Sequence, residues 1–288
     1  MNDSTSSSII IIFIIITLTT TGTFAAVNFA ATTTTTATTS NTTSASTTSS
    51  SNTTGHTGSE PATPALDGFS QIQYGAKTCL ATISTLASND VLVLFTGGAS
   101  SGLVFNVTDT ANLQWHLRAS AQFNSLGTFT ETFEEYYATS ESPLSGDRIS
   151  VTNTLSAGSI GCSALGISGA DIASPFDPST GCPSGTVVPL TNQSTPSTIN
   201  GEMKICTSNP SDILVSSIWI RGDALVSSPA GFTVPPGRLA TSPPIGNSPS
   251  LNEAYERVLT DQSGLALTWA FGGDSWAMIT DAITANGS

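Results

Sequence analysis

The residues of this chain that could carry out catalysis are acidic, and they are densest at Glu131, Glu134 and Glu135. Paired carboxylates hydrolyse glycosides when they lie about 5 Å or about 6.5–9.5 Å apart. Glu131 and Glu135 alternate onto one face of a predicted strand, which separates them by ~13 Å. That separation is too long for either mechanism, so the cluster is interpreted as a solvated strand face. No catalytic residue is assigned.

Two aspartates in the loop sequence SGADIASPFDPSTG suit cation binding. Asp171 and Asp177, together with nearby carbonyl oxygens, could hold a structural Ca²⁺ ion, because calcium takes oxygen ligands from flexible loops. The spacing does not match an EF-hand, and Asx turns use the same residue types. Beyond structural Ca²⁺, no cofactor is predicted.

The aromatic residues could form a stacking platform for sugars. Aromatic side chains in strands usually pack in cores, so only the members expected to be exposed are candidates. These are Trp115 and Tyr137, which are the predicted ligand-binding residues. His116 follows Trp115, and no serine or cysteine marks a nucleophile for it, so it is interpreted as structural.

The strands that must position these residues are short and are separated by turn residues. The run Asp90–Phe95 ends at Gly97-Gly98 and predicts a central strand buried on both faces. Alternation over 129–137, 265–271 and 277–283 predicts further strands, and no long segment has a helical period. Residues 65–288 are therefore predicted to be all-β, as a single antiparallel, jelly-roll-like β-sandwich domain.

A weak internal repeat accompanies these strands. The segment SNDVLV (88–93) is similar to PSDILV (210–215), and LSGD (144–147) loosely matches QSGL (262–265). Two similar half-units of about 110 residues would suit a double Greek key. Shared turn chemistry would produce the same similarity, because an Asp before a strand is common in turns.

All four cysteines lie in the predicted β domain. An even count in an exported chain favours two disulfides, and three pairings are open. The residues concerned are Cys79, Cys162, Cys182 and Cys206.

The N-terminal 31 residues are predicted to be a secretory signal or a membrane anchor. An apolar core over Ile9–Ile16 and small residues at Ala25-Ala26 fit a cleaved signal, although no Lys or Arg precedes the core. A retained hydrophobic helix over 9–31 would also be long enough to cross a bilayer. Both alternatives place the rest of the chain outside the cytoplasm, at the cell surface or secreted.

Residues 32–64 are predicted to be a disordered stalk. Ser and Thr occupy 20 of the 27 positions from 32 to 58, so the tract cannot bury enough apolar surface to fold. Such stalks are often glycosylated. Sequons predict glycosylation at Asn41 and Asn52 in the stalk and at Asn106 and Asn192 in the β domain.

Four stretches of the chain resemble segments of secreted, jelly-roll-like β-sandwich domains in archaeal surface proteins. They are DTANLQWHLRA (109–119), EEYYATSESPLSGDRISVT (134–152), GISGADIASPFDP (166–178) and TSNPSDILV (207–215). The resemblance implies an extracellular module and carries over no functional residue.

Charge narrows the function classes. The chain has 7 basic and 20 acidic residues and a net charge of −13, so nucleic-acid binding is not expected. The favoured function is a surface-displayed protein with an adhesin-like, carbohydrate-binding or envelope-structural role. Its partners would be carbohydrate or other surface proteins, and it would contact membrane only through residues 9–31. The alternatives are a polysaccharide-acting, concanavalin-like enzyme and a subunit of a filament or surface layer.

Overall fold

The computed structural model describes residues 63–99, 103–125, 129–154, 159–179, 188–222, 225–236 and 249–287. This part of the chain is all-β and every strand pair in it is antiparallel, as the sequence predicted. Among these residues, no helix is long and apolar enough to cross a membrane. The predicted signal or anchor (1–31), most of the predicted stalk (32–62), Asn41, Asn52 and Cys182 lie outside the described residues.

The first nine strands form one half-unit made of two sheets. The inner sheet has the order β1-β9-β4-β7-β6, and β2 also pairs with β9; the outer sheet has the order β3-β8-β5. The strands are β1 (Ala65–Phe69), β2 (Gln73–Gly75), β3 (Thr78–Ile83), β4 (Asp90–Ala99), β5 (Phe105–Thr108), β6 (His116–Ser125), β7 (Phe129–Ser140), β8 (Asp147–Asn153) and β9 (Ile160–Ser168).

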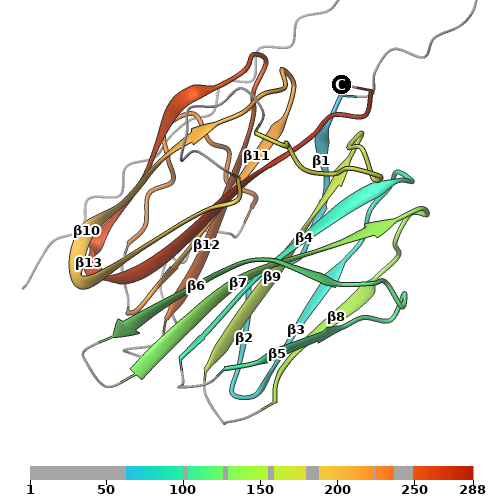
Figure 1. Cartoon of the computed structure of the whole chain (residues 1–288). Coiled ribbons are helices and arrows are strands. Elements are labelled where there is room, and N and C mark those ends of the chain that lie inside the picture. The colour runs from blue at the N-terminus through green and yellow to red at the C-terminus, as the bar shows by residue number, and fades with distance from the viewer. Residues whose placement is uncertain are drawn as a thin grey trace, which may run out of the picture. The chain divides into compact units, whose positions relative to one another are not determined.

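The remaining four strands form the second half-unit, with the order β10-β13-β11-β12. They are β10 (Leu190–Cys206), β11 (Ile213–Ile220), β12 (Ser250–Arg257) and β13 (Ser263–Ile283). The two predicted strands at 265–271 and 277–283 are thus one long strand. β10 and β13 run side by side as a curved ribbon (Figure 1). Leu267 and Met278, on either side of Gly272-Gly273, belong to the same hydrophobic cluster, so the ribbon folds back on itself.

The weak sequence repeat corresponds to a repeated backbone arrangement. The Thr85 N–H donates to the Leu144 carbonyl, and the Leu144 N–H donates to the Thr85 hydroxyl, each at 3.0 Å. Thr207 and Gln262 make the same two hydrogen bonds at the same distances. Because the partners within each pair are 59 and 55 residues apart in the chain, local turn chemistry alone does not explain the match.

The strand registers extend this correspondence. In the first half-unit, β4 pairs with β7 and β9; in the second, β11 pairs with β12 and β13. When Val91 is aligned with Ile213, Glu135 of the first half-unit corresponds to Glu253 of the second. In the same alignment, Tyr137 corresponds to Tyr255. The first stretch of β13 and the end of β10 take the places of β8 and β3. The described chain therefore consists of two structurally equivalent half-units.

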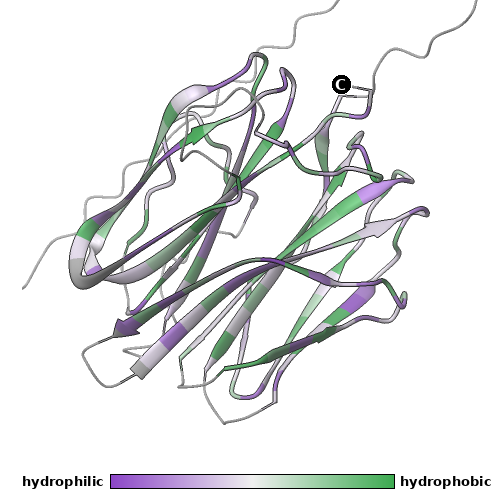
Figure 2. Cartoon of the chain, in the orientation of Figure 1, coloured by the Kyte–Doolittle hydropathy of each residue, from purple (hydrophilic) through white to green (hydrophobic). Residues whose placement is uncertain are grey.

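Three hydrophobic clusters hold these layers together. One lies inside the first half-unit, between the inner and outer sheets, and another lies within the second half-unit. The third joins the two half-units, with Val91, Val93 and Phe95 of β4 facing Ile213 and Val215 of β11. β4 is therefore buried on both faces, as predicted, and is hydrophobic over much of its length (Figures 1 and 2).

The contact between the half-units centres on Trp219. A Cβ atom added at Gly97 would lie 2.4 Å from the indole, and one added at Gly161 would lie 2.8 Å from it. Two adjacent strands, β4 and β9, thus present bare backbone where the ring sits. The indole N–H donates to Glu131 at 2.6 Å, which satisfies the one polar atom of the ring.

One disulfide joins the two sheets of the first half-unit. Cys79 of β3 bonds to Cys162 of β9 across the inner core, and both side chains are buried. Of the three pairings open to the sequence, this bond leaves only Cys182 with Cys206 for a second disulfide.

Substitution of Gly97 by Ala is expected to destabilise the protein by ~2–3 kcal/mol, because the new methyl group overlaps the Trp219 ring. Urea unfolding monitored by tryptophan fluorescence measures the change. Gly272→Ala is the matched control, since a Cβ there meets nothing within 4 Å. Equal stability of the two variants would contradict the proposed role of the Trp219 contact.

A peptide map without reductant is expected to contain Cys79 linked to Cys162 and Cys182 linked to Cys206. Reduction of the first bond should cost ~2–4 kcal/mol of unfolding free energy, because it releases a long closed loop. A map in which Cys79 is alkylated without prior reduction would refute the bond.

Candidate functional site

The acidic cluster of β7 is buried, so its interpretation as a solvated strand face is wrong. Glu131, Glu134 and Glu135 are 1%, 9% and 0% exposed. Residues 131, 133, 135 and 137 do share one face, as the alternation predicted, but the second half-unit covers that face. Glu134 points to the other side, where the Tyr136 hydroxyl donates to it at 2.6 Å.

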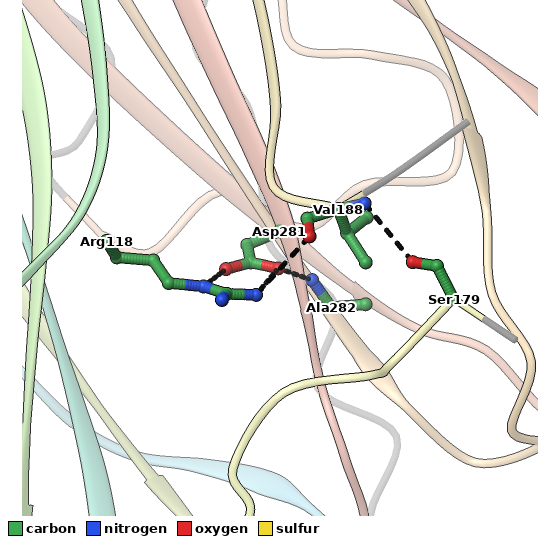
Figure 3. Close-up of polar contacts among 5 residues, drawn as sticks. All are labelled: Arg118, Ser179, Val188, Asp281 and Ala282. Atoms are coloured by element: carbon green, nitrogen blue, oxygen red, sulfur yellow. Dashed lines mark hydrogen bonds and ion pairs between the residues drawn. The ribbon is translucent and has the colours of Figure 1, made fainter. Parts of the chain in front are cut away.

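Glu135 lies beside an ion pair that joins the two half-units. Arg118 of β6 donates through Nε to Asp281 of β13 at 2.7 Å, and the Asp281 carboxylate also accepts the Ala282 N–H (Figure 3). A second guanidinium nitrogen reaches the Val188 carbonyl at 3.5 Å. The bridge therefore ties the edge of the inner sheet of the first half-unit to β13 and to the chain just before β10.

Arg118 is the cation that lies beside two fully buried acids, Glu135 and Asp281. Burial, and then the neighbouring Asp281 charge, raise the pKa of Glu135 well above its ordinary value, although Arg118 opposes the shift. Burial also raises the pKa of Asp281, and the hydrogen bond from Arg118 lowers it again. The cluster therefore favours a protonated Glu135 beside an Arg118–Asp281 pair, which minimises buried net charge.

A row of rings leads from this ion pair to the surface. The Arg118 guanidinium lies 3.9 Å from the centre of the Phe176 ring, a cation–π contact. Phe176 meets Tyr137 edge-on at 4.9 Å, and Tyr137 lies 5.2 Å from His116. Each ring is held by its neighbour, so the buried ion pair fixes the orientation of the exposed end.

The row ends at a surface hollow of about 480 Å³. The hollow is lined by the start of β6 and the residue two positions before it, by the end of β7 and by the connection between the half-units. The lining residues are Gln114, His116, Tyr137, Thr139, Ile172, Ala173 and Pro175. Asn112 and Glu141 add an amide and a carboxylate. The hollow combines an aromatic surface with donors and acceptors on several sides, an arrangement suited to a polar ligand with apolar faces.

The two predicted ligand-binding aromatics occupy different places. Tyr137 lines the hollow, on the side of the sheet that faces the second half-unit. Trp115 packs against the core inside the first half-unit, and its indole N–H donates to Asp109 at 2.6 Å. The structure therefore gives Tyr137 the neighbours His116 and Phe176, and gives Trp115 a role in the Asp109 turn.

The predicted calcium ligands both accept hydrogen bonds from the chain itself. Asp171 accepts the N–H groups of Ala173 and Ser174, as in an Asx turn. Asp177 is buried and accepts from Ser179, Ser208 and Asn209. Within the described ranges, no group of three or more His, Cys, Asp or Glu residues is arranged to hold a metal. Calcium at this loop stays a prediction.

The two predicted glycosylation sites in the described part of the chain, Asn106 on β5 and Asn192 on β10, are both exposed. The Asn192 amide also donates to the Glu202 carbonyl at 2.7 Å.

The second half-unit uses the equivalent positions differently. Glu253, equivalent to Glu135, accepts a hydrogen bond from Ser163 of the first half-unit. Tyr255, equivalent to Tyr137, packs against the cluster between the half-units and pairs with Thr233. The hollow is therefore formed by parts that the second half-unit does not repeat among the described residues, namely the start of β6 and the connection that contains Ile172, Ala173 and Pro175.

Sequence reasoning missed Arg118, Asp281 and Phe176. Arg118 carried a signal, because it is one of only 7 basic residues and stands inside a strand pattern. Its partner is 163 residues away, and no local pattern connects the two.

In comparisons with known proteins, no family model, curated protein or solved structure matches the chain.

Replacement of Arg118 by Met is expected to cost ~3 kcal/mol of unfolding free energy at pH 7, because Asp281 then loses its buried partner. The loss should be smaller at pH 4, since both acids have a raised pKa and can be neutral there. Urea unfolding at the two pH values measures it. Arg148→Met, at an exposed position on β8, is the control, and an equal loss at both pH values would contradict the buried cluster.

Proposed function

We propose that this protein is an extracellular, surface-displayed binding protein that takes up carbohydrate in the hollow beside Tyr137. The observation that carries the proposal is the fixed ring of Tyr137 within a hollow that also offers amide, hydroxyl, imidazole and carboxylate groups. A sugar presents C–H groups on its ring faces and hydroxyls around its rim. The C–H groups pack on an aromatic ring, and the hydroxyls form hydrogen bonds with such polar groups.

The rest of the chain supports display outside the cell. A disulfide inside a small β unit is typical of oxidising compartments. The predicted signal or anchor and the predicted Ser/Thr-rich stalk would export the β domain and hold it away from the membrane, with glycans on the stalk. The first half-unit packs two antiparallel sheets around one core, and the second folds one antiparallel sheet back around another. Each is proposed to be a jelly-roll-like sandwich of the kind seen in lectin domains.

The number of acids that line the hollow favours binding over polysaccharide hydrolysis. Of its described lining residues, Glu141 alone is acidic, whereas glycoside hydrolysis uses a pair. The denser acids, Glu131 and Glu135, are buried under the second half-unit and are closed to a polysaccharide.

A glycan array probed with the purified, secreted chain tests the proposal. The wild-type protein is expected to bind at least one class of neutral glycan, and Thr139→Arg is expected to weaken that binding about tenfold or more by filling the hollow. The design is structurally conservative, because Arg257 occupies the equivalent position in the second half-unit.

Leu117→Ala is the matched control, because Leu117 neighbours His116 on β6 but is paired with Tyr136 and is 55% exposed. It should bind like wild type. No binding to any glycan at high micromolar concentration, or equal binding by the Thr139→Arg variant, would overturn the proposal.

A further inference from the structure

The two half-units begin their central strands with the same buried acid. Asp90 is the first residue of β4, and Asp212 immediately precedes β11. Each follows a residue with a left-handed backbone, Asn89 at φ 62° and Ser211 at φ 77°. Both carboxyl groups are 0% exposed.

A second aspartate caps the turn before each of these acids. Asp67 Oδ2 accepts the N–H groups of Leu86 at 2.6 Å and Ala87 at 2.9 Å. Asp177 Oδ2 accepts those of Ser208 at 2.7 Å and Asn209 at 3.1 Å. In both half-units the capped residues stand four and three positions before the buried acid.

The capping acids come from equivalent places in the two sheets. Asp67 lies on β1, which pairs with β9, and β9 pairs with β4. Asp177 follows Phe176, which bridges to Ile283 of β13, and β13 pairs with β11. Each capping aspartate thus reaches over one strand to the acid that begins the next.

The buried acids lack the partners that an ionised carboxylate requires. The carboxyl oxygens of Asp90 and Asp212 have no hydrogen-bond partner at ordinary distances among the described residues, although the Thr85 hydroxyl and the Ala285 amide lie close enough to offset part of the burial effect on the two pKa values. An ionised carboxylate in such a place would cost several kcal/mol. A protonated carboxyl group instead carries its own donor, which it can give to the neighbouring aspartate.

The charged groups around each acid are acidic as well. Asp212 faces Asp177 and, from the turn between β12 and β13, Asp261; the nearby Ala285 amide gives a smaller opposing effect. Asp90 faces Asp67, with the Thr85 hydroxyl nearby. A nearby like charge opposes the ionisation of the buried acid of each pair.

We propose that each half-unit holds one buried proton between two aspartates, Asp90 with Asp67 and Asp212 with Asp177, and that these equivalent proton-binding sites stabilise the fold in acidic surroundings. The ligand is the proton itself. In each site the capping aspartate holds the turn through the backbone, and the proton lets the strand-initiating acid pack beside it. Loss of the proton sets two carboxylates against each other at the start of a central strand.

The direction in which stability changes with pH follows from the pKa shifts of these aspartates. Burial, and then Asp177, raise the pKa of Asp212 from 3.8 to about 9, and burial also raises the pKa of Asp90. An acid with a raised pKa in the folded state loses stability as pH rises from its unfolded value to its folded one, here from about 4 to about 9. The pKa of Asp177 is lowered by its hydrogen bonds, which outweigh its burial, so its contribution is lost only below about pH 4. The expected optimum is mildly acidic.

Urea unfolding of the whole chain between pH 3 and pH 9 tests these sites. The wild-type protein should lose stability steadily above about pH 4. Asp212→Asn should fall less steeply and should exceed wild type in its folding equilibrium constant at pH 8 by about tenfold or more, because Asn is neutral at every pH and can donate to Asp177. Asp90→Asn should act in the same direction, and the double variant should keep only the smaller slope that the other acids with a raised pKa contribute, Glu134, Glu135 and Asp281 among them.

Asp171→Asn is the matched control, since Asp171 caps an exposed turn, and it should keep the full wild-type slope. Wild-type stability that is constant or rises from pH 4 to pH 9 would overturn the proposal, as would Asn variants with the wild-type slope. If the variants do not fold, infrared spectroscopy of the wild-type protein in D₂O decides. Protonated carboxyl bands with the intensity of more than one group per chain are expected at pH 7, because Glu135 accounts for at most one of them. An intensity of one group or less refutes the buried protons.

Discussion

The packing of Trp219 against bare backbone is the constraint on which the joining of the two half-units depends. Trp219 and Gly97 are equivalent residues of the two half-units, and they touch each other. Where equivalent positions meet at an interface, only one of them can be large. The indole takes the whole space, Gly97 and Gly161 leave it free, and Glu131 satisfies the ring nitrogen.

The chemistry along this interface differs from one end to the other although the backbones match. Near one end, Arg118 and Asp281 form a buried pair beside Glu135; elsewhere, Glu253 takes its hydrogen bond from Ser163. The hollow lies where the first of these arrangements reaches the surface. Equivalent backbones with unlike side chains thus surround this hollow with residues that the equivalent place in the described second half-unit lacks, and Ile172, Ala173 and Pro175 complete its lining.

The acidic composition acquires a structural meaning in this fold. Nine of the 20 acidic residues are buried among the described part of the chain, so much of the negative charge is not a solvated surface. Some accept backbone N–H groups in turns, as Asp147 and Asp177 do, and some accept side-chain donors, as Glu131 and Glu134 do. Asp90 and Asp212 sit where a proton replaces a cation. With only 7 basic residues in the chain, protonation is the main means of neutralising them.

The sequence by itself determined the fold class, the central position of β4 and the repeated turn at Asp90 and Asp212, because alternation and turn chemistry are local. Alternation also placed Glu131, Glu135 and Tyr137 on one face, but a period of two says nothing about what covers a face. Only the tertiary structure decided that a second half-unit buries that face, that Arg118 meets Asp281, and that Trp115 and Tyr137 have separate surroundings. Those outcomes depend on contacts between residues far apart in the chain. A charged residue that would be stable in water needs a partner or a proton once such contacts bury it.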